Sequence, residues 1–373
     1  MKIGLTSAVF NKQRGISRYV VELAERFVKD NEIHLLTSKY EHKIDGLNVV
    51  EDPIIWRPIS AQVASNAILN MRRIKELKKS VDVVNSQGAE ALNPDVVTMQ
   101  SVQKAAVRQF IKDRGWGYGI LKGFEPRNNV VLAIEKRALK NSKKVIAISN
   151  TVKKEVIVNY GLPDEKIAVI HSGVNLDEFN PKNKAIHAGG VRARHGLSVE
   201  DTVLMFSGWE FKRKGLQYII ESLPKIGDNA KVLVVGGASQ KPYVDLARKF
   251  GVSDRVIFAG HRKNISEYYA ASDMFVFPTS YEPFGLVITE AMATGIPVVT
   301  TKCAGAAELI TDGVDGMLLK SPYDSGELAE KINHILDNNL ADVMGKRARA
   351  TAEKYSWESV AEKTLDVYRK TIQ

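Results

Sequence analysis

The chain has 373 residues, of which 44% are hydrophobic and 26% are charged, and its formal net charge at pH 7 is +10. Such a composition supports ordinary hydrophobic cores and excludes a fibrous or disordered protein. The single cysteine, Cys303, cannot form an intrachain disulfide, and no apolar run reaches 18 residues, so we expect a cytoplasmic protein without a membrane-spanning helix.

The excess of positive over negative charge is confined to the N-terminal half. The first 185 residues hold 30 Lys and Arg against 20 Asp and Glu, which leaves 23 of each for the remainder. This asymmetry indicates that the N-terminal half meets an anionic partner, such as lipid, nucleic acid or an acidic substrate. Ordinary surface charge would also explain it.

Short apolar runs alternate with amphipathic helical patterns along the chain. Strands are predicted at 3–9, 33–37, 81–85, 96–99 and 144–148, and after the polar stretch 180–196 at 203–207, 231–235, 256–259, 274–277 and 297–300. This alternation predicts an α/β fold with two doubly wound parallel sheets, in a domain over 1–184 and a second over 185–355. Residues 356–373 predict a helix, which we expect to pack back on the N-terminal domain.

Ligands of doubly wound sheets bind at the carboxyl ends of the strands, so two such domains predict a cleft between them. Gly15 follows the first predicted strand and directly precedes a helix, which suits close approach of a ligand to the backbone. Gln100 and Ser101 follow the strand at 96–99, and neither can act as a general base near neutral pH.

Cations and aromatic residues are interleaved over residues 104–127. The cations are Lys104, Arg108, Lys112, Arg114, Lys122 and Arg127, and the aromatic residues are Phe110, Trp116, Tyr118 and Phe124. This pattern is typical of a segment that docks on an anionic membrane surface. A solvated helical pair with inward-facing aromatic rings is the alternative.

Three adjacent cations, Lys212, Arg213 and Lys214, lie between Gly208 and Gly215, in a predicted strand-to-helix turn. Adjacent cations repel one another unless they are solvated or share an anion. The turn is therefore either an ordinary charged surface turn or a site for a pyrophosphate.

The segment YEPFGLVITE contains two carboxylates. Glu282 lies in the loop after the strand at 274–277, and Glu290 lies about one turn into a helix predicted after Gly285, over 286–294. Unpaired N–H groups at the helix start favour a phosphate. We expect Glu290 to accept hydrogen bonds from sugar hydroxyls and Glu282 to face the reacting carbon, unless both belong to a solvated face.

Taken together, these segments resemble the retaining glycosyltransferases of the GT-B class, family 4, over nearly the whole chain. The most specific marker is the E-x7-E element in EPFGLVITEAMATGIPVV, and GHRKNISEYYAASD is similar to lipopolysaccharide-core glucosyltransferases. The resemblance implies a GT-B fold and transfer of a hexose from a nucleoside-diphosphate sugar, for which we expect UDP, with retention of configuration. The expected acceptor is a glycolipid or an oligosaccharide in cell-surface synthesis, at the inner face of the cell membrane.

The resemblance also implies roles for individual residues. Lys214 and Arg213 would neutralise the diphosphate of the donor, Glu290 would bind the ribose, and Glu282 would lie beside the transferred sugar. No dedicated protein nucleophile is then required. The donor-binding set is completed by Gly15, Gly208 and Gly305 and by the backbone amides of Phe284, Gly285, Leu286 and Val287, and the residues near the acceptor are Gln100 and Ser101.

The chain departs from the family pattern at three places. Gly208-Trp209 stands where the family usually has Gly-Arg, so Arg213 must supply the second cation. Gln100 and Ser101 stand where many relatives have a histidine, so base assistance must come from the leaving phosphate or from elsewhere. Ala304-Gly305 replaces a glycine pair, which adds a methyl group beside the sugar pocket.

The sequence has no D-x-D motif, and its seven histidines show no metal-ligand spacing, so we expect no metal and no cofactor. Two other functions remain as alternatives. A sugar-nucleotide epimerase of the GT-B shape would turn over its substrate without an acceptor. A nucleic-acid-binding protein would explain the high pI, although the sequence has no RNA-binding motif.

Overall fold

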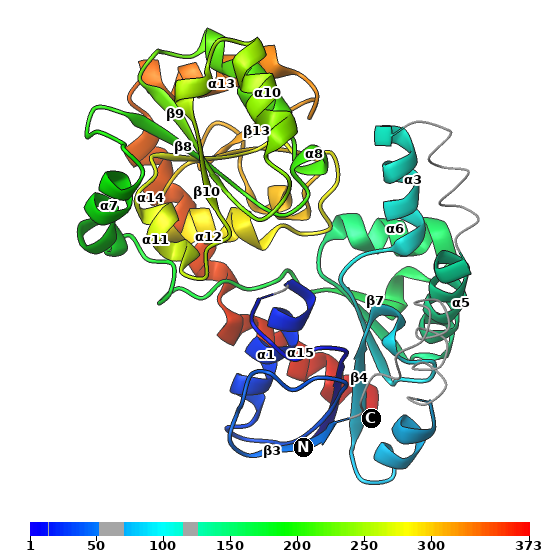
Figure 1. Cartoon of the computed structure of the whole chain (residues 1–373). Coiled ribbons are helices and arrows are strands. Elements are labelled where there is room, and N and C mark those ends of the chain that lie inside the picture. Colours follow the sequence, from blue (N-terminus) through cyan, green and yellow to red (C-terminus); the bar gives the residue numbers. More distant parts are fainter. Residues whose placement is uncertain (14, 52–70, 115–125) are drawn as a thin grey trace. The chain divides into compact units, whose positions relative to one another are not determined.

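The computed structural model describes residues 1–13, 15–51, 71–114 and 126–373, and the chain forms two compact units (Figure 1). Unit 1 comprises Met1–Gly173 together with Trp357–Gln373, and unit 2 comprises Val174–Ser356. Each unit is an α/β layer structure around its own parallel sheet and is described by itself.

Within the described residues, unit 1 contains a seven-stranded parallel sheet with the strand order β3-β2-β1-β4-β5-β6-β7. Every residue of the central strand β4 is buried, as expected for a parallel sheet that is covered on both faces. The strands are β1 (Lys2–Ser7), β2 (Glu32–Thr37), β3 (Leu47–Glu51), β4 (Val83–Gln87), β5 (Val96–Met99), β6 (Lys144–Ala147) and β7 (Ile167–Val169). The helices are α1 (Gly15–Phe27), α3 (Gln103–Arg114), α5 (Pro126–Asn141), α6 (Asn150–Tyr160) and α15 (Trp357–Ile372), with short 3-10 turns at Gly88–Glu90 and Asp164–Lys166.

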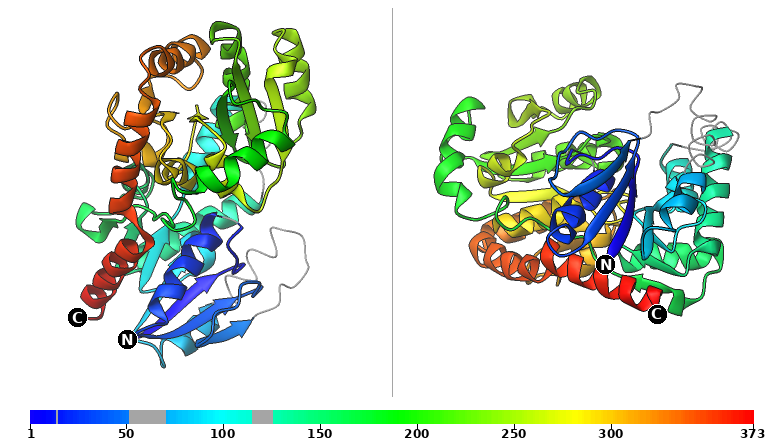
Figure 2. Two further views of the ribbon diagram at one scale, coloured as in Figure 1. Left: turned by 90° about the vertical axis from the view of Figure 1, so that its left-hand side faces the viewer. Right: turned by 90° about the horizontal axis from the view of Figure 1, so that it is seen from below.

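Helix α15 belongs to unit 1 and packs against α1 and β4 (Figure 2). The Trp357 ring meets the Tyr19 ring edge-on at a centroid distance of 5.4 Å, and Tyr368 meets Phe27 in the same way at 5.9 Å. The side-chain amide of Asn85 in β4 donates a 2.7 Å hydrogen bond to the Tyr368 hydroxyl oxygen. The C-terminal helix therefore completes the core of unit 1.

The structure divides the chain after residues 173 and 356, whereas the sequence predicted domains that end at 184 and 355. The difference at the first boundary arises because the chain just after residue 173 packs on unit 2. Phe179 is fully buried and meets Tyr269 edge-on at 5.7 Å. The Arg349 guanidinium donates to the carbonyl oxygens of Leu176, Phe179 and Ala293.

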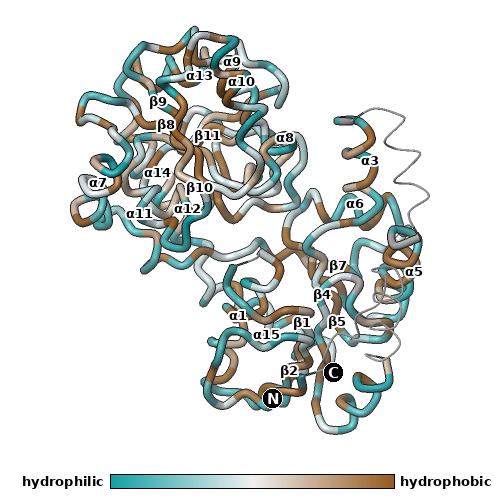
Figure 3. Tube along the Cα trace, in the orientation of Figure 1, coloured by the Kyte–Doolittle hydropathy of each residue, from teal (hydrophilic) through white to brown (hydrophobic). Residues whose placement is uncertain are grey.

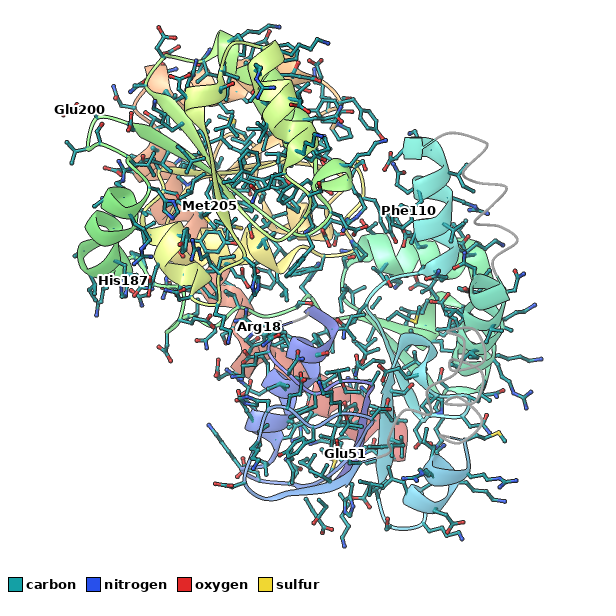
Figure 4. All side chains as sticks on the ribbon, in the orientation of Figure 1. Arg18, Glu51, Phe110, His187, Glu200 and Met205 are labelled. Carbon is teal, nitrogen blue, oxygen red and sulfur yellow. The ribbon has the colours of Figure 1, made fainter. Side chains whose placement is uncertain are left out.

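Unit 2 contains a six-stranded parallel sheet with the order β10-β9-β8-β11-β12-β13. Its strands are hydrophobic, and Met205 in β8 is enclosed by other side chains (Figures 3 and 4). The strands are β8 (Thr202–Ser207), β9 (Ala230–Val235), β10 (Val256–Gly260), β11 (Met274–Phe277), β12 (Val298–Thr301) and β13 (Met317–Leu319). The helices are α7 (Asn183–Arg194), α8 (Phe211–Lys214), α9 (Leu216–Ser222), α10 (Lys241–Lys249), α11 (Ile265–Ala270), α12 (Leu286–Thr294), α13 (Ser325–Asp337) and α14 (Ala341–Ala352), with 3-10 turns at Leu223–Lys225, Ser253–Arg255, Gly305–Leu309 and Glu353–Tyr355.

The strand order of unit 2 reverses at β8, which has β9 on one side and β11 on the other. The loops after β8 and β11 therefore leave the same edge of the sheet side by side, at the position where doubly wound sheets bind ligands. The predicted pair of doubly wound parallel sheets is confirmed, and so is the helix predicted over 286–294.

The contact between Asn85 and Tyr368 generates a stability prediction. Tyr368→Phe removes the hydroxyl oxygen and leaves a buried amide donor of Asn85 with one partner fewer, so we expect a loss of roughly 1–3 kcal/mol in unfolding free energy. The measurement is a thermal melt followed by circular dichroism. The same substitution at Tyr323, whose side chain is 42% exposed, is the control and should leave the Tm nearly unchanged. Equal Tm values for both variants would contradict the prediction.

Candidate functional site

The loop after β8 lies directly on the loop after β11. Gly215 has a φ of +84°, and a Cβ there would lie 2.2 Å from the carbonyl oxygen of Pro278. The N–H and the hydroxyl of Ser280 donate to the carbonyl oxygen of Arg213 at 2.9 and 3.2 Å. The absence of a side chain at position 215 therefore allows this close approach, which fixes Arg213 and Lys214 at the end of α8.

The two loops bring three predicted residues together: Arg213, Lys214 and Glu282, here called the cation–glutamate cluster. Oε2 of Glu282 lies 3.3 Å from Nη1 of Arg213 and 3.3 Å from Nζ of Lys214. The side chains are only 14%, 13% and 16% exposed, respectively. The Lys214 ammonium also lies 4.8 Å from the centre of the Phe277 ring. Both cations therefore share one largely buried carboxylate.

Arg213 is held by more partners than Lys214. Its Nε and Nη2 donate to Oε2 of Glu210 at 3.0 and 2.8 Å, and its Nη1 donates to the Tyr281 carbonyl oxygen and to Glu282. These contacts engage four of the five N–H groups of a guanidinium. The Lys214 ammonium has three N–H groups, and Glu282 is the only carboxylate within 4 Å of it among the residues that the structure describes. Lys214 has more capacity for an additional acceptor.

The cations also fix the ionisation of Glu282. Burial by itself would raise the pKa of this carboxyl, but the charges of Lys214 and Arg213 outweigh it and hold the pKa below its ordinary value. Burial would likewise lower the pKa of Arg213, and the carboxylates of Glu282 and Glu210 raise it instead. At neutral pH Glu282 is a carboxylate, which accepts hydrogen bonds and does not serve as a general acid.

Helix α12 begins at the end of the same loop. Gly285 precedes it with a φ of +98° and has no side chain to cap the first N–H groups, which lack acceptors within the helix. A Cβ at Gly285 would lie 3.1 Å from Cγ of Glu282. Leu286 and Val287 are the first two residues of α12 and directly follow Gly285. These three of the predicted backbone donors therefore lie beside the cation–glutamate cluster.

The remaining donor-binding candidates of unit 2 surround this loop. The Gly305 N–H donates to the Glu282 carbonyl oxygen at 2.9 Å, and the Ala306 N–H donates to that of Phe284 at 2.8 Å. A Cβ at Gly208 would lie 2.3 Å from Cδ of Lys214, so the lysine chain runs over this glycine. The segment after β12 thus supports Glu282 from one side and the loop after β8 supports it from the other.

Glu290 lies on α12 and is only 6% exposed. Its Oε2 is 3.1 Å from the Tyr269 hydroxyl, which is also 3.0 Å from the Val287 carbonyl oxygen. Tyr269 comes from α11 and donates its single proton to one or the other of these acceptors. The second predicted carboxylate is therefore held against the first turn of α12.

Gly15, Gln100 and Ser101 lie in unit 1, where Gly15 is the first residue of α1. The side-chain amide of Gln100 donates to the Ile16 carbonyl oxygen at 3.3 Å and to Oε1 of Gln87 at 2.8 Å. Gln100 therefore contacts the first turn of the helix that Gly15 begins. Both amide protons are engaged, and among the described residues no group donates a hydrogen bond to its Oε1.

The sequence reasoning missed three polar residues, of which Glu210 and Tyr269 belong to unit 2 and Glu90 belongs to unit 1. Glu210 could have been found from its spacing of three residues before Arg213 on α8. Tyr269 and Glu90 had no such signal because their partners are distant in sequence. Glu90 accepts from the Ala8 N–H and the Thr6 hydroxyl at 3.0 and 3.1 Å, and burial raises its pKa to about 7.

Within the described residues, no group of three or more His, Cys, Asp or Glu side chains is arranged to hold a metal ion. None of the helices in the same part of the chain is both long and apolar enough to cross a bilayer.

Two families match nearly the whole chain between them. Glycosyltransferase Family 4 matches residues 13–178, and Glycosyl transferases group 1 matches residues 191–351. An uncharacterized glycosyltransferase from Methanocaldococcus jannaschii is 31% identical over 253 residues, which are 66% of this chain and 65% of that protein. The D-inositol 3-phosphate glycosyltransferase of Xylanimonas cellulosilytica is 30% identical over 67% of this chain and 61% of its own length. The chain thus spans slightly less than two thirds of these curated relatives.

Solved structures share the fold at lower sequence identity. WaaG, a glycosyltransferase involved in lipopolysaccharide biosynthesis, has a TM-score of 0.81 at 22% identity, covering 98% of this chain and 99% of WaaG. HepE from Anabaena, solved with UDP and glucose, has a TM-score of 0.73 at 20% identity, covering 99% of this chain and all of HepE.

The lowered pKa of Glu282 leads to a prediction about stability and pH. The ion pairs are present above the pKa of an unfolded glutamate, and they are lost as the pH falls through the lower folded pKa. Glu282→Gln should therefore reduce the unfolding free energy at pH 7 by about 2 kcal/mol and lower the Tm. The difference in Tm between the variant and the wild type should shrink toward pH 3. The measurement is a series of thermal melts between pH 7 and pH 3.

The same change at the exposed Glu330 is the control, and it should shift the Tm little at every pH. A Glu282→Gln variant that melts with the wild type at pH 7 would contradict the assigned role of this carboxylate.

Proposed function

Since the chain belongs to the family 4 glycosyltransferases, we propose that it transfers a hexose from a UDP-sugar to a hydroxyl group of a glycolipid or oligosaccharide, with retention of configuration. The observation that carries the proposal is the cation–glutamate cluster beside the start of α12. UDP is favoured because HepE, which shares the fold, was solved with UDP and glucose. A hydroxyl acceptor is consistent with the relatives that are inositol phosphate glycosyltransferases.

In the proposed reaction, the bond between the anomeric carbon and the diphosphate breaks and negative charge grows on the leaving phosphate. The Lys214 ammonium and the first N–H groups of α12 stabilise this charge, because preorganised donors contribute most where charge develops. Arg213 adds its charge, and its contacts with Glu210 and Tyr281 hold it in place. The acceptor oxygen forms a new bond to the anomeric carbon on the face that the diphosphate leaves, and the departing phosphate accepts the proton of the acceptor hydroxyl. The acceptor is therefore the nucleophile, and no protein nucleophile or base takes part.

The two glutamates have different roles in this proposal. Glu282 is ionised and lies beside the diphosphate donors, so it stabilises the positive charge that develops on the sugar ring and accepts from a sugar hydroxyl. Glu290 is held by Tyr269 at the first turn of α12, where it binds the ribose hydroxyls. Gly15, Gln100 and Ser101 of unit 1 are proposed to contact the sugar or the acceptor. The reaction as proposed uses no metal ion.

Binding and turnover should respond differently to substitutions in the cluster. Lys214→Met removes a charged donor to the phosphate and should weaken UDP binding roughly 10- to 150-fold. Glu282→Gln should lower turnover at least about 100-fold and leave UDP affinity unchanged or stronger, because Lys214 loses a competing carboxylate. Calorimetry with UDP and a transfer assay with UDP-hexoses give the two readings.

The matched control is Lys212→Met, which removes an exposed lysine from the same helix and should not change UDP affinity. Loss of UDP binding in Glu282→Gln would contradict the role given to this residue.

A thermal-shift screen of UDP-, GDP- and ADP-sugars identifies the donor, since a ligand at 100 times its Kd stabilises the protein by about 2.7 kcal/mol. Conversion of a nucleotide sugar without an acceptor would indicate an epimerase.

We also propose that the protein is cytoplasmic and docks on an anionic membrane through residues 104–127. The supporting observation is that Lys104, Arg108 and Lys112 of α3 are all exposed and recur every four residues, which places them along one side of the helix. Phe110 lies on the same helix (Figure 4). Trp116, Tyr118, Lys122 and Phe124 lie outside the described residues.

Vesicle sedimentation tests this surface. Replacing Lys104, Arg108 and Lys112 by Glu should abolish sedimentation with phosphatidylglycerol vesicles, because each basic residue near an anionic surface contributes about 1 kcal/mol. The control is the same charge change at Lys241, Arg248 and Lys249 of α10, which are also exposed. Unchanged sedimentation of the α3 variant would contradict membrane docking by this helix.

A further inference from the structure

Trp209 is the residue that follows Gly208 in the loop after β8, and its side chain remains largely exposed. It is 59% exposed, whereas Trp357, the other tryptophan in the described part of the chain, is 1% exposed. Isolated exposed apolar residues are common on protein surfaces. Exposure alone therefore assigns no role to Trp209.

The Trp209 ring is held in place by two neighbouring loops. Its centroid lies 5.0 Å from that of His261, which follows β10, with an angle of 42° between the two rings. A Cβ at Gly237, in the loop after β9, would lie 2.3 Å from Cζ3 of Trp209. The indole therefore rests on bare backbone and against an imidazole. An aromatic ring fixed in this way offers a large contact area at a low cost in conformational entropy.

The position of this pair follows from the strand order. Strands β10, β9 and β8 are neighbours, and their carboxyl ends carry His261, Gly237 and Trp209. The next strand on the other side of β8 is β11, whose loop carries Glu282. Because neighbouring strands are about 4.8 Å apart, the aromatic pair lies roughly two strand spacings from the cation–glutamate cluster along the same edge.

The connection that carries His261 also leads to the residue proposed to bind ribose. It continues into α11, where Tyr269 contacts Oε2 of Glu290. The edge of the sheet thus presents an aromatic pair, a buried carboxylate and a cation cluster. A nucleoside diphosphate has a flat base, a ribose with two hydroxyls and a charged diphosphate, one chemical group for each of these three features.

We propose that Trp209, fixed by His261 and Gly237, stacks against the nucleobase of the donor. This inference rests on the proposed function and adds a specificity element that the family pattern does not contain, since Gly-Arg is usual where this chain has Gly208-Trp209. The indole takes over part of the binding at a position where the chain lacks the usual cation. It contributes by stacking instead of charge.

The test separates base binding from phosphate binding. Calorimetry on the full chain uses UDP, GDP and ADP, with inorganic pyrophosphate and ribose 5-diphosphate as probes that lack a base. Trp209→Ala should weaken the preferred nucleoside diphosphate roughly 5- to 150-fold, the range for loss of one base–aromatic stack, and leave both base-free probes unchanged. Trp209→Phe should restore most of the affinity.

Tyr323→Ala, which removes another exposed aromatic ring of unit 2, is the matched control and should bind all probes as the wild type does. Trp209→Ala with wild-type affinity for the nucleotide would overturn the inference and leave the proposed function intact. An equal loss for nucleotide and pyrophosphate would overturn it as well, because it would place Trp209 in support of the phosphate loop. A wild-type protein that binds no nucleoside diphosphate would overturn the proposed function itself.

Discussion

The carboxylate of Glu282, shared by Arg213 and Lys214, is the contact on which the functional end of unit 2 depends. A carboxylate this far from water is costly unless it is paired, and both cations lie 3.3 Å from one of its oxygens. Because the cations end α8 and the glutamate follows β11, the pair joins the two loops where the strand order reverses. The start of α12 and the segment after β12 are then placed by hydrogen bonds to the same loop.

Strands such as β8 and β11 could be predicted because they are apolar runs that are buried on both faces of the sheet. Three further strands, β3, β7 and β13, could not. All five residues of β3 are at least partly accessible, and β7 and β13 have three residues each, too few to show a period. The segment just after residue 173 was assigned to the wrong side of the boundary because the contacts of Phe179 with unit 2 are tertiary.

For the site as well, residues with a local sequence signal could be predicted, and residues defined by tertiary contacts could not. Glycines after strands and clustered charges are local signals, and they located the loops that hold Lys214, Glu282 and Gly285. The partners of these residues are not local: Tyr269 reaches Glu290 across 21 residues, and Gln100 reaches Ile16 across 84. A sequence pattern names the reactive side chains more readily than the groups that orient them, because orientation depends on which elements the fold makes neighbours.

The hydrogen-bond inventory of the cluster also distinguishes two cations that the sequence presents as equivalent. The cluster of Arg213, Lys214 and Glu282 has one cation in excess, and the neighbouring Glu210, which is 48% exposed, pairs with Arg213 and leaves that excess on Lys214. Arg213 has used four of its five N–H groups, whereas the ammonium of Lys214 keeps donors for a further acceptor. A diphosphate would therefore be held by Lys214 and the N–H groups of α12. Arg213 would hold the Glu282 carboxylate, which in turn positions the Lys214 ammonium. In this arrangement the arginine beside the lysine acts mainly through Glu282, although both are cations.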